Sequence, residues 1–142
     1  MVQTWRTFVS PKGSRVFFRV VGHALENVIY GNMDVGIAIR LQSEFDVVER
    51  VHGKFVGFHY WHHAPTYDTA YRASWMAWLE QKKGTLKETH FLTKSRIVRM
   101  GLAVANIAYS HTTFVVHAEE PSYVEQRRRF MPDAPIPSAS KV

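Results

Sequence analysis

The feature of this sequence that most restricts its fold is the spacing of its apolar residues, which changes along the chain. Residues 4–9 and 15–22 are rich in β-branched and aromatic side chains, and the turn sequence Pro-Lys-Gly-Ser at 11–14 separates them. Two such runs around a turn are typical of a β-hairpin. A third, short extended piece is expected at 28–31. The chain therefore begins as an all-β segment.

From Asp34 onward, helical and strand patterns alternate. Apolar residues recur every three or four positions up to Gly53, which indicates an amphipathic helix. Residues 54–61 are almost continuously apolar, as in a strand covered on both faces. Further along we expect a helix over about 68–82, a strand over 86–92, a helix striped by Ile97, Met100, Val104, Ile107 and Ala108, a strand over 112–116 and a short helix over 121–130.

Such alternation requires right-handed crossovers between parallel strands. We therefore predict an α/β fold with a single mixed, partly parallel sheet of about five to six strands, packed with helices and carrying the antiparallel hairpin at its N-terminal edge. The predicted core consists of Ile37, Leu41, Phe45, Val56, Phe58, Trp75, Leu79, Phe91, Ile97, Val104 and Val115. Gly101 lies inside a predicted helix, where it indicates close approach of that helix to the sheet or to another helix.

Length and composition fit one domain. The chain has 142 residues, of which 46% are hydrophobic, enough for a single core. We assign residues 1–130 to one domain and 131–142, with three prolines and two serines, to a flexible tail. Cysteine is absent, which excludes disulfides and cysteine-ligated metals and is typical of the cytoplasm, where we place the protein. No apolar run approaches the roughly 18 residues of a membrane span.

The net charge of +6 raises the question of nucleic acid as a partner. The basic residues are scattered, however, and Arg127–Arg129 is the only dense run. No RNA-recognition aromatic pair, zinc-ligand spacing or helix-turn-helix accompanies them, so we do not expect a nucleic-acid partner.

Residues 92–108 (LTKSRIVRMGLAVANIA) and the upstream stretch from 67–72 (YDTAYR) to Leu79 resemble uncharacterised bacterial proteins of the STAS/SpoIIAA-like type. The resemblance covers about residues 54–118 and implies a STAS-like fold. It also implies a non-catalytic regulatory domain that binds protein partners. In antagonists of this type an Asp-Ser-Ser-Gly step follows the middle strand, whereas this chain has HHAPTYDT at 62–69. Thr66 or Thr69 could accept a phosphate there, but we favour Thr66 or Asp68 as a helix cap.

The candidate binding site follows from topology. In open sheets of this kind, ligands bind beyond the carboxyl ends of the parallel strands. Helix N-termini at that edge would favour an anion. We expect the site residues His62, His63, Thr66, Asp68, Lys94, Ser95 and Arg96 to lie there side by side. Their partner would be a protein, a second copy of the chain, a small anion or a lipid.

Chemistry is not expected from the motifs present. Ser95 lacks the flanking glycines of a nucleophile elbow, and paired carboxylates and a glycine-rich phosphate loop are missing. The eight histidines do not stand at metal-ligand spacing, although His90, His111 and His117 could meet through the fold. We therefore lean against an enzyme and predict no catalytic residue, metal or cofactor.

The alternative function is binding of a small ligand or lipid, as in SpoIIAA/SEC14-like proteins. Five aromatic residues would then line a pocket rather than fill the core: Tyr60, Trp61, Tyr71, Trp75 and Trp78. An enclosed cavity of several hundred Å³ would favour this reading. A filled core with an exposed apolar patch would favour a protein partner.

Overall fold

The computed structural model describes residues 4–109, 111–132 and 135–137. Its strands form one mixed sheet in the order β1-β2-β3-β4-β5-β6. The first three strands pair antiparallel, and β3 to β6 pair parallel. The bounds are β1 (Arg6–Val9), β2 (Arg15–Val21), β3 (Ala24–Tyr30), β4 (Phe55–His63), β5 (Leu86–Leu92) and β6 (Thr113–His117). The predicted mixed, partly parallel sheet with an N-terminal hairpin is confirmed.

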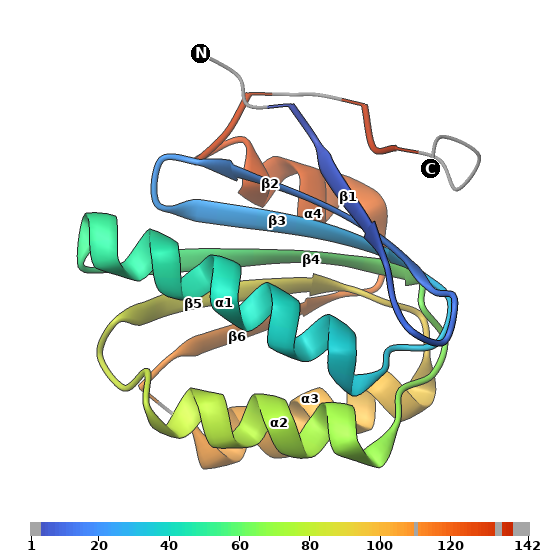
Figure 1. Cartoon of the computed structure of the whole chain (residues 1–142). Coiled ribbons are helices and arrows are strands. Elements are labelled where there is room, and N and C mark those ends of the chain that lie inside the picture. The colour runs from blue at the N-terminus through green and yellow to red at the C-terminus, as the bar shows by residue number, and fades with distance from the viewer. Residues whose placement is uncertain (1–3, 110, 133–134, 138–142) are drawn as a thin grey trace.

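Helices cover both faces of the sheet unequally (Figure 1). The three crossover helices lie on one face: α1 (Val35–His52), α2 (Thr69–Glu80) and α3 (Arg96–Ala108). Consecutive right-handed crossovers between neighbouring strands place their helices on the same side. The short helix α4 (Glu120–Arg127) follows the last strand and lies on the opposite face.

Local sequence signals fix the ends of α1. The side chain of Asp34 accepts a hydrogen bond from the amide of Ile37 at 3.2 Å and so caps the first turn. The helix stops at Gly53, whose φ of 72° is in the left-handed region that glycine adopts without strain. Leu41, Phe45 and other residues of the predicted stripe are buried.

Two apolar clusters lie on the two faces of the sheet. The larger, under α1 to α3, includes Phe18, Phe45 and Phe91. The smaller, on the α4 side, includes Phe58 and Tyr123. Strand β4 contributes to both, because alternate side chains point to opposite faces. This explains the almost continuous apolar run that predicted a doubly covered strand.

Several predicted boundaries and core positions differ from the structure. Strand β3 begins at Ala24, before the predicted start, and β4 continues through His63. In the predicted core, Ile97 and Val104 are wrong: they are 56% and 46% exposed. Trp75, Leu79 and Val115 are half-buried rather than buried.

The error in α3 has a physical cause. This helix carries two apolar stripes, and the one formed by Val98, Leu102 and Ala105 faces the core. Gly101 beside it lets α3 approach Tyr67, whose hydroxyl oxygen would lie 2.8 Å from a Cβ built on the glycine. The close approach predicted from Gly101 is therefore to a side chain from the loop before α2. The bulkier stripe is left facing outward.

A buried charge cluster holds α4 on its face of the sheet. Arg127 donates to Glu26 at 2.9 Å and Arg19 does so at 3.3 Å, and all three side chains are at most 3% exposed. The hydroxyl of Tyr123 donates to the same carboxylate at 2.9 Å. Arg127 therefore belongs to the interior, and the run Arg127–Arg129 is not one exposed basic patch.

The segment after α4 also contacts this face. Met131 is buried with Phe58 and Tyr123, and the carbonyl of Pro132 accepts a hydrogen bond from Arg19. The carbonyl of Pro137 accepts one from the hydroxyl of Tyr30. Residues 133–134 and 138–142 of the predicted tail lie outside the described residues, and the flexibility of 131–142 stays a prediction.

Candidate functional site

Two histidines end the central strand at the carboxyl edge of the sheet. The ring of His63 is exposed and stacks on Tyr30 at 4.7 Å between centroids, and burial lowers the pKa of His63. His62 is half-buried, and its Nδ1 atom has no hydrogen-bond partner among the described residues. The two rings lie 5.2 Å apart at a steep angle, so they do not present two nitrogens to one point.

Thr66 and Asp68 connect the start of α2 to the loop before α1. Thr66 donates to the side-chain oxygen of Asn32 at 2.8 Å, and Asn32 donates to Asp68 at 2.8 Å. Lys12 donates to Asp68 at 2.9 Å, and this hydrogen bond lowers the pKa of that carboxyl. Asp68 stands at the N-cap position of α2 but makes no side-chain cap, so the predicted capping role is wrong. Both side chains instead tie loops together.

Ser95 joins the starts of α2 and α3. Its hydroxyl accepts from the amide of Val98 at 3.3 Å, which caps α3, and donates to the carbonyl of Pro65 at 2.7 Å. The predicted cap at Ser95 is confirmed. The bond to Pro65 also brings the segment after β4 against the segment after β5.

The basic residues at the start of α3 point to solvent. Lys94, Arg96 and Arg99 are exposed and form no ion pair with any described residue. No acidic residue occurs in the sequence between Glu88 and Glu119, so no carboxylate of α3 offsets them. The helix start therefore carries net positive charge at the surface.

The outward stripe of α3 continues from these charges. Ile97, Met100, Val104 and Ile107 recur at helical spacing on one side and are 56%, 63%, 46% and 83% exposed. We call this set the α3 face. Sequence reasoning missed it because periodicity alone assigns such a stripe to the core. The signal that could have revealed it is the second stripe, Val98, Leu102 and Ala105, which competes for the same role.

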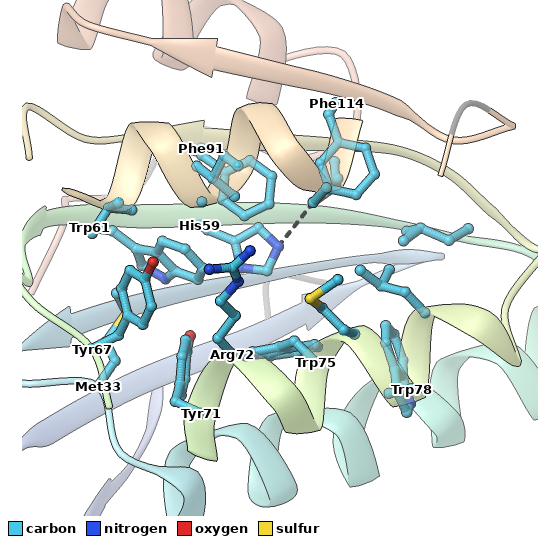
Figure 2. A pocket seen from close by; sticks show the side chains of 18 of the residues that line it. Met33, His59, Trp61, Tyr67, Tyr71, Arg72, Trp75, Trp78, Phe91 and Phe114 are labelled. Atoms are coloured by element: carbon cyan, nitrogen blue, oxygen red, sulfur yellow. Dashed lines mark hydrogen bonds between the residues drawn. The ribbon is translucent and has the colours of Figure 1, made fainter. Parts of the chain in front are cut away.

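A small pocket lies beneath α3, between the sheet and α2 (Figure 2). Its walls are mainly aromatic: Trp61 and Phe91 come from the sheet, and Tyr71, Trp75 and Trp78 come from α2. The space inside is about 90 Å³. The hydroxyl of Tyr71 and the indole nitrogen of Trp75 are buried without a hydrogen-bond partner among the described residues. Four of the five predicted aromatics therefore line a cavity, but a small one.

A neutral histidine forms the floor of this pocket. His59 accepts a hydrogen bond at Nδ1 from the amide of Asn27 at 2.8 Å, so its Nε2–H donates to Thr89 at 2.9 Å. Trp61 in turn donates to the oxygen of Asn27 at 2.9 Å. Complete burial lowers the pKa of His59 to about 3. The network satisfies the polar atoms of an otherwise apolar floor, and it leaves no titrating group there at neutral pH.

Other features of the described part of the chain bear on possible ligands. Within it, no group of three or more histidine, aspartate or glutamate side chains is placed to hold a metal ion. No helix there is both long enough and apolar enough to cross a bilayer.

Comparison with known proteins adds the fold relationship. No protein-family model and no curated protein matches the sequence. An uncharacterised protein of the DUF3478 family with a SpoIIAA-like fold, from Shewanella loihica PV-4, superposes with a TM-score of 0.59 at 8% identity, covering 87% of this chain and 91% of that one. The anti-sigma factor antagonist SpoIIAA in its unphosphorylated form superposes with a TM-score of 0.56 at 9% identity, covering 88% and 98%. The chain therefore has a SpoIIAA-like fold.

Proposed function

We propose that this protein is a non-catalytic regulatory domain of the STAS type that binds another protein through the α3 face. The observation that carries the proposal is the exposure of Ile97, Met100, Val104 and Ile107 on one side of a helix. Contiguous apolar patches on a monomer's surface mark interaction sites. The cytoplasm, inferred from the absence of cysteine, is where we place this interaction.

Charge indicates the chemistry of the partner. Lys94, Arg96 and Arg99 adjoin the α3 face, and none is offset by a described carboxylate. A partner with an apolar groove rimmed by carboxylates or a phosphate would match this surface, and its affinity should fall as salt rises. Ser95 already caps one amide, so the anion would contact the remaining first-turn amides together with Lys94 and Arg96.

Site-specific cross-linking tests this function. A photoreactive residue is placed at Ile107 on α3, or at Val47 on α1, which is 44% exposed and serves as the matched control. We expect one protein to be captured in the source cells from position 107 and not from position 47. Lys94→Ala combined with Arg96→Ala should reduce that capture. Equal capture from both positions, or a cross-link only between two copies of this chain, would contradict the proposal.

Binding of a small ligand is the second candidate, favoured by the unpartnered Tyr71 hydroxyl and Trp75 indole nitrogen. The pocket's 90 Å³ is below the roughly 150 Å³ of a cavity that binds benzene and far below the 300–1,000 Å³ of ordinary ligand sites. A lipid chain would therefore require α2 and α3 to separate. Titration with phenol tests the site: a shift of the Trp75 indole N–H resonance that Tyr71→Phe weakens would support it, and an unchanged resonance would remove it.

A further inference from the structure

A chain of hydrogen-bonded side chains runs across the other face of the sheet, beside α4. The Oγ atom of Ser122 lies 2.8 Å from Nδ1 of His117. The Nε2 atom of His117 lies 3.0 Å from Nδ1 of His90, and Nε2 of His90 lies 3.0 Å from a carboxylate oxygen of Glu88. The parallel pairing of β5 with β6 brings these histidines, 27 residues apart, to one face.

The interior of this chain is dry and its outer end is not. His90 and His117 are 3% and 8% exposed, and their rings stack at 5.3 Å between centroids. His90 also stacks on Phe58 at 4.8 Å. Burial lowers the pKa of both histidines, which keeps them neutral at neutral pH. Ser122, in the first turn of α4, is exposed to solvent.

The protons in this chain can be placed by elimination. Although burial raises it, hydrogen bonds from His90 and Arg129 hold the pKa of Glu88 below its usual range, so Glu88 is a carboxylate that only accepts. His90 must then donate through Nε2, and a neutral ring has one N–H, so its Nδ1 accepts from His117. The remaining nitrogen of His117, Nδ1, accepts in turn. The hydroxyl of Ser122 is therefore the donor to His117.

One competitor for that proton is present. The Ser122 hydroxyl also lies 3.1 Å from the carbonyl oxygen of Glu119, one turn earlier. The histidine nitrogen is closer, at 2.8 Å, and its proton order leaves it without another donor among the described contacts. A hydroxyl bonded to an imidazole that is itself oriented by a second group has the arrangement of an activated nucleophile.

We propose that Ser122 is a nucleophilic hydroxyl that accepts an acyl group from a neutral activated ester. Ser122 Oγ forms a bond to the ester's carbonyl carbon while its proton passes to Nδ1 of His117. The carbon–oxygen bond to the leaving group then breaks, and the departing alkoxide or phenolate takes that proton from His117. Glu119 and Glu120 precede Ser122 and disfavour a polyanionic donor, which is why the donor is neutral. This modification goes beyond the proposed binding function.

Acetylation by p-nitrophenyl acetate tests the proposal, with the modified positions located by peptide mass mapping. Ser43, an exposed serine of α1 with no histidine partner among the described contacts, is the reference within the same molecule. We expect Ser122 to be acetylated much faster than Ser43. His117→Gln should slow Ser122 by roughly 10²- to 10⁴-fold and leave Ser43 unchanged. Equal rates at the two serines, or an unaffected rate in His117→Gln, would overturn the proposal.

Glu88 and His90 are positioning residues, and their role has its own readout. In Glu88→Gln the new amide can donate to His90, which reverses every bond of the chain and places a proton on Nδ1 of His117. We expect ¹⁵N chemical shifts to report that tautomer and the acetylation of Ser122 to slow. Arg129→Gln removes the ion pair to Glu88 but keeps the carboxylate, so it should react as wild type. A wild-type His117 already protonated at Nδ1, or a Glu88→Gln variant that reacts normally, would contradict the assignment.

Discussion

His59 shows what a single buried titratable residue does to stability. Its pKa is about 3 in the folded protein, against 6.5 for an unperturbed histidine, because burial disfavours the charged ring. The unfolded chain therefore binds the proton more readily. The stability that depends on neutral His59 is complete above about pH 6.5 and is lost as the pH falls toward 3, at about 1.4 kcal/mol per unit.

Between pH 7 and pH 5 this linkage should reduce the free energy of unfolding by about 2 kcal/mol. Urea unfolding at the two pH values measures the loss. In His59→Gln, an amide can keep the bonds to Asn27 and Thr89 without titrating, so the variant should lose about 2 kcal/mol less than wild type. The other histidines are common to both proteins and cancel. An identical pH dependence of the two would show that His59 is not buried in its neutral form.

At the scale of the element, α3 allows the two apolar stripes to be compared directly. Leu102 is 9% exposed and faces the pocket side, whereas Ile107 is 83% exposed. Leu102→Ala should cost about 2–5 kcal/mol because it empties core volume. Ile107→Ser should change stability by no more than about 0.5 kcal/mol, as for other surface substitutions. Urea unfolding of the pair measures both, and the reverse order of costs would mean that α3 is rotated from the orientation described.

At the scale of the whole molecule, the Arg19–Glu26–Arg127 cluster joins segments about a hundred residues apart. Glu26→Gln leaves two buried guanidinium groups without their counter-charge and should cost about 3–5 kcal/mol. Glu44→Gln is the matched control, because its partner Arg6 is half-exposed and a surface pair contributes about 1 kcal/mol or less. Equal midpoints of urea unfolding for the two variants would show that α4 is held by apolar contacts alone.

The order of strands and helices could be predicted from the sequence because each element carries its own period. The hairpin, the doubly covered β4 and the cap of α1 by Asp34 each follow from local residues. What could not be predicted depends on contacts between elements. The orientation of α3 is set by the approach of Gly101 to Tyr67, and both of its stripes satisfy the same period.

The candidate site divides along the same line. Topology places Ser95 beside Pro65, so the two helix starts of the predicted edge do meet. The bonds of Thr66 and Asp68 to Asn32 come from a loop far away in sequence, which no spacing announces. The meeting of His90 with His117 likewise depends on the register of β5 and β6.

The most direct test of the central claim is the dissociation constant of the partner captured at position 107. Met100→Glu with Ile107→Glu places charge in the α3 face, and Val47→Glu with Val51→Glu makes the same change on exposed positions of α1. If the α3 face is the interface, the first variant should raise the Kd by about 30-fold or more, as loss of a hot spot does, and the second should leave it unchanged. An unchanged Kd in the α3 variant, or an equal loss in both, would contradict the account.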